Sequence, residues 1–479
     1  MIFWSSFRQA AATSQKAVPK CLTTDTDAGG LLSPSLIAIV LFIFGILCTL
    51  IPVDFYQRTV GEKNYMYGNW RMYIYIALCT SAFLISTFLA MRIAKRNRVK
   101  TSSWFMRSSK ISRFGMNRLV ITISLLNLIL CSVRLIFMEL TIGIGAILST
   151  FSSGGGSQLR DTIIAAIADG KVGWISDVTL GLTVAIWWIA SQAVRQKRRL
   201  LTVAFLNLAL FAFTSLLSLS RDILLTAILI VAIISVSKLN IIGFSNRIRS
   251  FLLVLAGVCI FGSIFIFVGG ARSSGGQDTL TRQFVGYFPA SYNRLAAEID
   301  GKLIYPNSNW GFYSSQWFWD LPVITNVFNL YDVGKTLGLD TPQDSLDNWD
   351  QQFTSTQAAS LNRSYIWLTA YGFAFADYGW FGFVYFLIYG FLAGFLYIKF
   401  KQNTLFGGIL FPYLLTTIVK WWSILYLSSR TSVIMLGVAC LVWLIWQVVD
   451  VAVRGEGTYN NLTSKSAGYE LNQSGCKND

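Results

Sequence analysis

Apolar runs long enough to cross a lipid bilayer recur along most of this chain. A transmembrane helix needs roughly 20 predominantly apolar residues. We expect such helices at residues 35–53, 72–91, 118–138, 174–193, 200–219, 222–238, 250–269, 365–398, 404–421 and 430–449. A composition of 54% hydrophobic and only 13% charged residues over 479 positions is too apolar for a soluble domain. The sequence therefore predicts an all-α, polytopic integral membrane protein with about 10 transmembrane helices.

Basic residues predict which way the chain crosses the membrane. Nine basic residues and no acidic one lie between Arg92 and Arg118, and positive charge in short loops stays on the cytoplasmic side. With ten crossings, the basic segments at 195–199, 238–249 and 399–401 return to that side, so both termini are expected in the cytoplasm. Loop charge of this kind accounts for the formal net charge of +16, and we do not expect a nucleic-acid partner.

This topology divides the chain into five parts. Residues 1–33 and 450–479 are predicted cytoplasmic tails, residues 34–269 contain helices 1–7, and residues 364–449 contain helices 8–10. Residues 270–363 form one large external loop domain, with nine acidic, six basic and fifteen aromatic residues. Disordered segments are poor in aromatic residues, so we expect this loop to be ordered and packed onto the outer membrane surface.

Several kinds of chemistry are excluded by residue type. The chain has no histidine, which removes His-dependent zinc sites and the Ser–His and Cys–His nucleophile pairs. Its seven cysteines lack metal-ligand spacing. Asp344, Asp347 and Asp350 do not follow the pattern of a calcium-binding loop and are expected on a solvated helix face. We therefore predict neither a metal nor a cofactor.

Arginine on the external side is not explained by topology. Arg221 lies in a hairpin turn, Arg272 follows the seventh predicted helix, and Arg363 and Arg430 open the eighth and tenth. Guanidinium groups bind phosphate oxygens in pairs and stay charged. We expect these four, with Arg160 in the loop after the third helix, to bind a diphosphate. The alternatives are contact with lipid headgroups and pairing with adjacent carboxylates.

Two carboxylates are candidates for a general base, because a hydroxyl nucleophile needs one when no histidine is present. The first is Asp377, where the amphipathic stretch 364–375 runs into the crossing that follows Gly379. The alternative role for Asp377 is to cap the following helix. The second candidate is Asp222, which otherwise pairs with Arg221 or caps a helix.

Aromatic residues of the external loop are candidates for contact with sugars, since their ring faces pack against the C–H faces of sugar rings. The residues we single out are Tyr287, Trp310, Trp317 and Trp319. The alternative is anchoring at the membrane surface, where Trp and Tyr concentrate.

The chain resembles the bacterial O-antigen polymerase (Wzy-type) family, also called oligosaccharide repeat unit polymerases. The resemblance rests on the number of helices, the late external loop, the Ser220-Arg221-Asp222 turn and two local segments. These segments are Tyr365–Thr369 leading into Asp377-Tyr378-Gly379-Trp380-Phe381-Gly382, and the glycine-spaced Tyr389–Gly394. One departure is that no external arginine is followed, after ten residues, by the glycine described in some members. The related O-antigen ligases use an outer histidine, which this chain lacks.

The resemblance implies a glycosyltransferase that joins oligosaccharide repeat units carried on undecaprenyl diphosphate, at the outer face of the bacterial cytoplasmic membrane. It implies a lipid-linked oligosaccharide substrate, contact with membrane lipid, and a chain-length regulator and a flippase as partners. In this scheme the arginines neutralise the departing diphosphate and Asp377 takes the proton of the acceptor hydroxyl. The alternative function is a polysaccharide transporter or lipid-linked oligosaccharide flippase.

Overall fold

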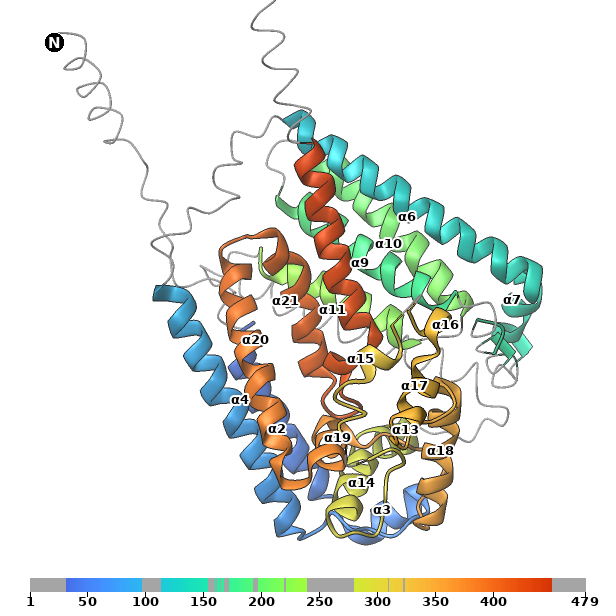
Figure 1. Cartoon of the computed structure of the whole chain (residues 1–479), viewed down its shortest axis with the longest axis vertical. Coiled ribbons are helices and arrows are strands. Elements are labelled where there is room, and N and C mark those ends of the chain that lie inside the picture. Colours follow the sequence, from blue (N-terminus) through green and yellow to red (C-terminus); the bar gives the residue numbers. More distant parts are fainter. Residues whose placement is uncertain are drawn as a thin grey trace, which may run out of the picture.

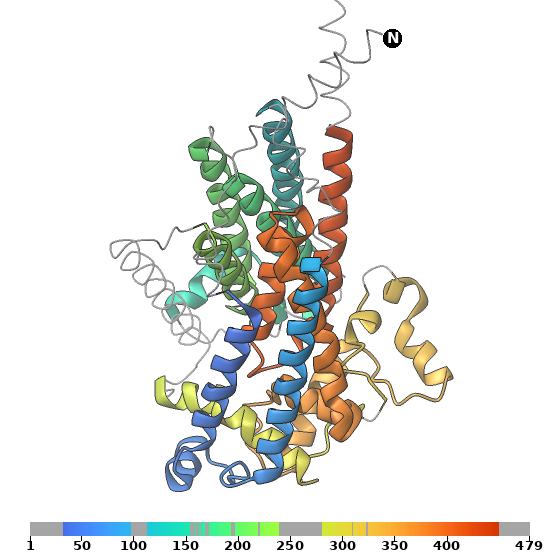
Figure 2. The same cartoon turned by 90° about the vertical axis from the view of Figure 1, so that its left-hand side faces the viewer.

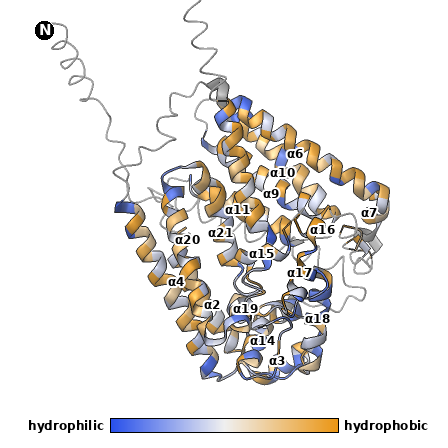
Figure 3. Ribbon diagram, in the orientation of Figure 1, coloured by the Kyte–Doolittle hydropathy of each residue, from blue (hydrophilic) through white to orange (hydrophobic). Residues whose placement is uncertain are grey.

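The computed structural model describes residues 32–96, 113–153, 159, 162–163, 165–167, 172–192, 197–218, 221–238, 280–308, 310–321 and 324–449. Within these ranges all regular secondary structure is helical and no strand occurs, which confirms the all-α prediction. Figure 1 shows the long helices running side by side, and Figure 3 shows them mainly in hydrophobic colours, with hydrophilic residues gathered at α17, α18 and several helix ends.

Six of the described helices are long and apolar enough to cross a membrane. They are α4 (Trp70–Arg96), α6 (Arg113–Thr141), α9 (Gly173–Gln192), α10 (Lys197–Leu217), the segment Thr369–Lys401 and the C-terminal helix Arg430–Val449. A seventh crossing arises if α2 (Pro34–Thr49) and α3 (Val53–Val60), bent by 88°, form one span. The chain is thus an all-α multi-pass membrane protein.

Two further apolar helices are shorter: α11 (Arg221–Val236) and α21 (Leu405–Val419). With them, nine of the ten predicted transmembrane runs coincide with helices. The tenth, residues 250–269, lies outside the described residues. The boundaries differ from prediction by a few residues in most cases, because capping and turn geometry set helix ends more than hydrophobicity does.

The predicted eighth helix is divided where the sequence places Gly379. Helix α19 (Thr369–Tyr378) ends there, a short 3-10 turn η5 (Gly379–Gly382) follows, and α20 (Phe383–Lys401) continues. Gly379 has φ of 55° and ψ of −134°, a conformation open to glycine and strained for residues with a Cβ atom. The break turns α19 onto α14 (Pro289–Ile299) in the external part of the chain.

Two glycines allow α20 to lie against α4 with almost no space between their backbones. A Cβ atom at Gly390 would lie 2.3 Å from the carbonyl oxygen of Phe83, and one at Gly394 would lie 2.4 Å from that of Thr87. Thr87 Oγ1 also donates to the Gly390 carbonyl at 3.0 Å. Small residues four apart serve this purpose in membrane helices, so the glycine-spaced segment of α20 is explained by packing.

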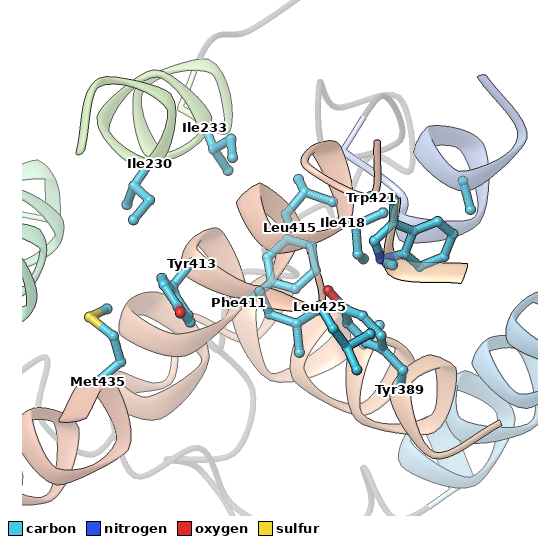
Figure 4. Close-up of a cluster of buried hydrophobic side chains, with 14 of the residues drawn as sticks. Ile230, Ile233, Tyr389, Phe411, Tyr413, Leu415, Ile418, Trp421, Leu425 and Met435 are labelled. Carbon is cyan, nitrogen blue, oxygen red and sulfur yellow. The ribbon is translucent and has the colours of Figure 1, made fainter. Parts of the chain in front are cut away.

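Helix α21 lies at the centre of the bundle, in contact with α2, α9, α11 and α20. Twelve of its fifteen residues are buried. Figure 4 shows Phe411, Tyr413, Leu415 and Ile418 of α21 among Ile230 and Ile233 of α11, Tyr389 of α20 and Met435 of the C-terminal helix. Because apolar contacts surround α21, the position of its last residues is tightly fixed.

The segment between the seventh and eighth predicted helices is mainly helical in its described residues. It contains α13 (Leu280–Tyr287), α14, α15 (Gln316–Trp319), α16 (Ile324–Phe328), α17 (Leu330–Thr336) and α18 (Ser345–Ala358). Asp344 caps α18 by accepting hydrogen bonds from the backbone N–H groups of Leu346 and Asp347, each at 2.8 Å. Asp344 therefore has a structural role as a helix cap. Among the described residues, no group of three or more Cys, Asp or Glu side chains is arranged to hold a metal ion.

A fully buried ion pair joins this external part to the loop after α3. Glu62 and Arg294 side chains have no exposed surface, and their two hydrogen bonds measure 3.0 Å each. The Glu62 carboxylate also accepts from the Tyr56 hydroxyl, the Asn293 amide and the Asn362 backbone N–H. With this many partners the buried charges are compensated, and Arg294 has a structural role.

Candidate functional site

The residues predicted from sequence lie in different parts of the structure. Arg160 and Arg272 lie outside the described residues, and for Arg221 the structure describes only the backbone, at the start of α11. Arg363 is exposed, with its guanidinium 5.9 Å from the Phe353 ring of α18. Arg430 opens the C-terminal helix and contacts α9. Arg363 and Arg430 therefore contact different elements, and the structure does not bring them together.

Arg430 is held by a carboxylate in the first turns of α9. Its Nε donates to Asp177 Oδ2 at 3.0 Å, and the Thr431 hydroxyl donates to Asp177 Oδ1 at 2.9 Å. The Asp177 side chain is only 3% exposed, whereas that of Arg430 is 37% exposed. Asp177 thus fixes one edge of the guanidinium while the other edge remains accessible.

The terminal nitrogens of Arg430 have no hydrogen-bond partner among the described residues. They lie beside Gly173, where a Cβ atom would be 3.6 Å from Nη2 and 3.7 Å from Nη1. A guanidinium whose Nε is anchored and whose two terminal nitrogens are free has the geometry that binds a phosphate or carboxylate through two parallel hydrogen bonds. Of the two predicted arginines whose side chains the structure describes, Arg430 is the better placed to bind an anion.

A second ion pair was not anticipated from the sequence. Lys420, one residue beyond α21, donates to Asp222 Oδ1 and to Thr226 Oγ1, both at 2.6 Å. The Tyr426 hydroxyl donates to the same Asp222 oxygen at 2.7 Å, and Lys420 Nζ lies 4.4 Å from the centre of the Tyr426 ring. The sequence signal was a lysine inside a predicted transmembrane run, which usually marks a functional or paired charge.

Asp222 keeps one oxygen available. Oδ1 accepts both hydrogen bonds, while Oδ2 receives none from the described part of the chain, and the side chain is 49% exposed. Its partner Lys420 is buried, with a side chain 7% exposed. Asp222 therefore pairs with Lys420 across 198 positions of sequence, and its free oxygen can accept a proton or hydrogen bond from a ligand.

The Asp222–Lys420 pair borders one small cavity of about 30 Å³. Tyr426 and Thr431 also line it, and the Thr431 hydroxyl donates to Asp177. This volume accommodates about one or two water molecules. It is too small to hold a sugar.

The lengths of two helices favour a site below the membrane surface. The 15 residues of α21 and the 16 of α11 extend roughly 22–24 Å, less than the roughly 30 Å of the hydrocarbon layer. Both helices have one end at the Asp222–Lys420 pair. Charges at such depth interact more strongly than at a solvated surface, because the surrounding dielectric is low.

Three helices begin at this site: α9 at Gly173, α11 at Arg221 and the C-terminal helix at Arg430. Their first N–H groups carry partial positive charge, which favours a bound anion. The described charged side chains here are Arg430, Lys420 and Arg134 of α6, with Asp177, Asp222 and Asp320, and they sum to zero.

Arg134 is buried inside a predicted transmembrane run, at 6% exposure. Its Nη2 donates to the hydroxyl of Ser218, immediately after α10, and its Nη1 has no partner in the described residues. It also interacts electrostatically with Asp177. Arg134 was not singled out from the sequence, although an arginine within an apolar run is a sequence signal of the same kind as Lys420.

The external helices reach this site through Asp320, which follows α15. Its carboxylate interacts electrostatically with Arg430 and accepts a hydrogen bond from the Tyr331 hydroxyl of α17. Burial raises the pKa of Asp320, while the Tyr331 hydrogen bond and the charge of Arg430 lower it. The end of α15 is therefore at the level of the first turn of the C-terminal helix.

Asp377, the first candidate for the base, is engaged in the structure. It is 3% exposed and accepts hydrogen bonds from the backbone N–H groups of Tyr313 and Ser314, at 3.1 and 2.6 Å, and from the Ser314 hydroxyl at 2.6 Å. It lies in the last turn of α19 and does not cap the helix that follows. This arrangement explains Asp377 as a residue that fastens the loop before α15.

Most of the aromatic candidates pack against other aromatic rings. Trp319 is 7% exposed, and the ring of Trp310 meets it edge-on at 5.4 Å. Tyr287 contacts Tyr365 and Trp422. Trp317, at 39% exposure, has the most accessible side chain of the four predicted residues. Aromatic content alone does not distinguish packing from sugar binding, because both use the same ring faces.

Comparison of the chain with known protein families, with curated proteins and with solved structures found no match.

Proposed function

We propose that this protein is a glycosyltransferase that polymerises undecaprenyl-diphosphate-linked oligosaccharide repeat units into O-antigen, capsular or exopolysaccharide, at the outer face of the bacterial cytoplasmic membrane. The observation that carries the proposal is Arg430, whose Nε is anchored by Asp177 while both terminal nitrogens have no described partner. Asp222, which lines the same small cavity as Thr431, the residue after Arg430, has a carboxylate oxygen that accepts no hydrogen bond from the described residues. A cation for the leaving group and a base for the acceptor are the two groups that this reaction needs.

The reaction follows from these positions. Asp222 accepts the proton of the acceptor sugar hydroxyl, and the acceptor oxygen forms a bond to the anomeric carbon of the donor. The bond from that carbon to the phosphate oxygen breaks, and the diphosphate leaves with the electron pair. Arg430 binds the oxygens on which negative charge increases, so its interaction is stronger in the transition state than in the ground state.

Asp222 is preferred over Asp377 as the base in this proposal. Both oxygens of Asp377 already accept hydrogen bonds from the loop before α15, so proton transfer there would disturb the external fold. Asp222 is half-exposed and next to a cationic site. Lys420 and Tyr426 hold its other oxygen and orient the carboxylate.

The test is polymer synthesis by purified protein supplied with lipid-linked repeat units in detergent. Loss of two charge-assisted hydrogen bonds, each worth about 1.5–3 kcal/mol, predicts that Arg430→Ala lowers the rate by about 100-fold or more. Arg430→Lys keeps the charge but not the paired geometry and is expected to recover only part of the activity. Asp222→Asn removes the base and is expected to abolish chain growth.

The matched control is Arg58→Ala, because Arg58 is an exposed arginine of α3 distant in sequence from the site. Thermal unfolding of each variant shows whether it is folded. Unchanged polymer ladders in folded Arg430→Ala and Asp222→Asn proteins would contradict the proposal. Movement of repeat units across liposomes without joining would instead indicate the alternative, a flippase.

A further inference from the structure

The external helices expose a group of large apolar side chains, which we call the apolar edge. It consists of Ile324, Val327 and Phe328 of α16, Val333 of α17 and Leu337 directly after α17, with exposures from 43% to 72%. Exposed apolar groups gathered on consecutive elements usually mark a surface that contacts a partner. Trp317 and Phe318, near 40% exposure, precede them in α15.

Two interactions tie this edge to the start of the C-terminal helix. Asp320, four residues before Ile324, interacts electrostatically with Arg430 in the first turn of a transmembrane helix. Tyr331 of α17 donates a hydrogen bond to Asp320, so α17 is tied to the same level. The outer ends of the transmembrane helices therefore define the height at which α16 and α17 lie.

The direction in which these helices extend is equally informative. Figure 2 shows the gold segment that contains α16 and α17 projecting sideways from the bundle, across the direction of the long helices. A segment that leaves the bundle sideways at the level of Arg430 meets the lipid that surrounds the bundle. The apolar edge is thus next to lipid.

We propose that the apolar edge inserts into the outer leaflet of the bilayer, at the boundary between headgroups and acyl chains, and anchors α15–α17 above the site. Short amphipathic segments bind membranes in this way, with apolar side chains a few ångströms below the headgroups and charged ones in water. The exposed Asp332 and Lys335 of α17 supply the charged groups. Trp317 and Phe318 belong to the residue types that concentrate at this depth.

A second copy of the chain is a less suitable partner for the same surface. Stable protein interfaces use about 20–30 residues on each side, whereas the edge consists of five side chains on two short helices. Lipid requires no such area, because the transmembrane helices already hold the protein in the membrane. The inference does not depend on the proposed enzymatic activity.

The experiment is to place an environment-sensitive fluorophore at the edge in nanodiscs. Phe328→Cys is labelled in a full-length protein whose other cysteines are replaced, and emission is measured with a quencher carried on lipid acyl chains or dissolved in water. The expected result is blue-shifted emission that the lipid-borne quencher reduces and the aqueous quencher does not. Asp350→Cys, at an exposed position of α18, is the control and should show the opposite.

Three outcomes would overturn the proposal. Quenching at position 328 by the aqueous reagent alone would show an edge open to water. Protection from both quenchers, with crosslinking between copies through position 328, would show a dimer contact. A result at 328 equal to that at 350 would show no depth difference. Val327→Asp with Phe328→Asp should in addition move a label at Trp317→Cys into water while the thermal unfolding of the protein stays the same.

Discussion

The buried pair of Glu62 and Arg294 gives the sharpest prediction of stability. Replacing Arg294 by Met removes two hydrogen bonds of 3.0 Å to a carboxylate with no exposed surface. It also removes donors to the carbonyls of Ala290 and Asn362, at 2.9 and 2.8 Å. Leaving one member of a buried ion pair without its partner costs about 3–5 kcal/mol, because the low-dielectric surroundings do not replace the lost charge interaction.

The assay is unfolding of the purified protein by heat and by denaturant. A cost of about 4 kcal/mol changes the folding equilibrium by roughly a thousandfold, since 1.4 kcal/mol is tenfold. The double variant Glu62→Gln with Arg294→Met should recover part of the loss, because no uncompensated charge remains. Arg58→Met is the control for removal of an arginine at an exposed external position. Equal stabilities of the Arg294→Met and Arg58→Met proteins would refute the reasoning.

Four further predictions follow from single contacts. Burial raises the pKa of Glu298 from 4.5 to about 8. The stability that comes from its protonated form is therefore complete below pH 4.5, falls as the unfolded state ionises, and is lost as pH rises through 8. Stability measured against pH should decline less steeply in Glu298→Gln than in the parent protein. Asp377→Asn should lower stability by about 1–3 kcal/mol, because Asn cannot accept all three hydrogen bonds; lost activity with unchanged stability would instead support Asp377 as the base. Lys420→Met should destabilise the protein by about 1–3 kcal/mol. Adding Asp222→Asn should restore part of this lost stability, measured by thermal unfolding. A purely additive loss in the double variant would argue against an interaction between Lys420 and Asp222. Gly394→Leu should separate α4 from α20, because its Cβ would lie 2.4 Å from the Thr87 carbonyl oxygen, and the thermal midpoint should fall well below that of Gly437→Leu, where nothing lies within 4 Å.

Local features of the fold were predictable from the sequence because they depend on neighbouring residues. Apolar runs located the helices, Gly379 marked the break before α20, and the aspartates at 344–350 were expected on a helix, which is α18. Each follows from hydrophobicity or backbone preference within a few positions. The exact number of crossings and the sidedness of the membrane remain predictions.

The candidate site was less predictable because its contacts join distant segments. Arg430 and Asp222 were both singled out, but the sequence paired neither with its actual partner. Asp177 is 253 positions from Arg430, Lys420 is 198 from Asp222, and Arg294 is 232 from Glu62. Periodicity and residue type contain no information on such pairs, which arise only when helices pack. The charged residues Lys420 and Arg134 inside apolar runs were the available signals.

The shortness of α11 and α21 has a consequence for how salt affects the protein. Ions in solution weaken attraction between exposed charges over a distance of about 8–10 Å at physiological concentration, but hardly act on charges enclosed by protein and hydrocarbon. The Lys420 and Asp177 side chains, 7% and 3% exposed, are enclosed in this way. The ion pairs that they form with Asp222 and Arg430 should therefore persist at high ionic strength, unlike the attraction of an anionic polymer to an exposed basic surface.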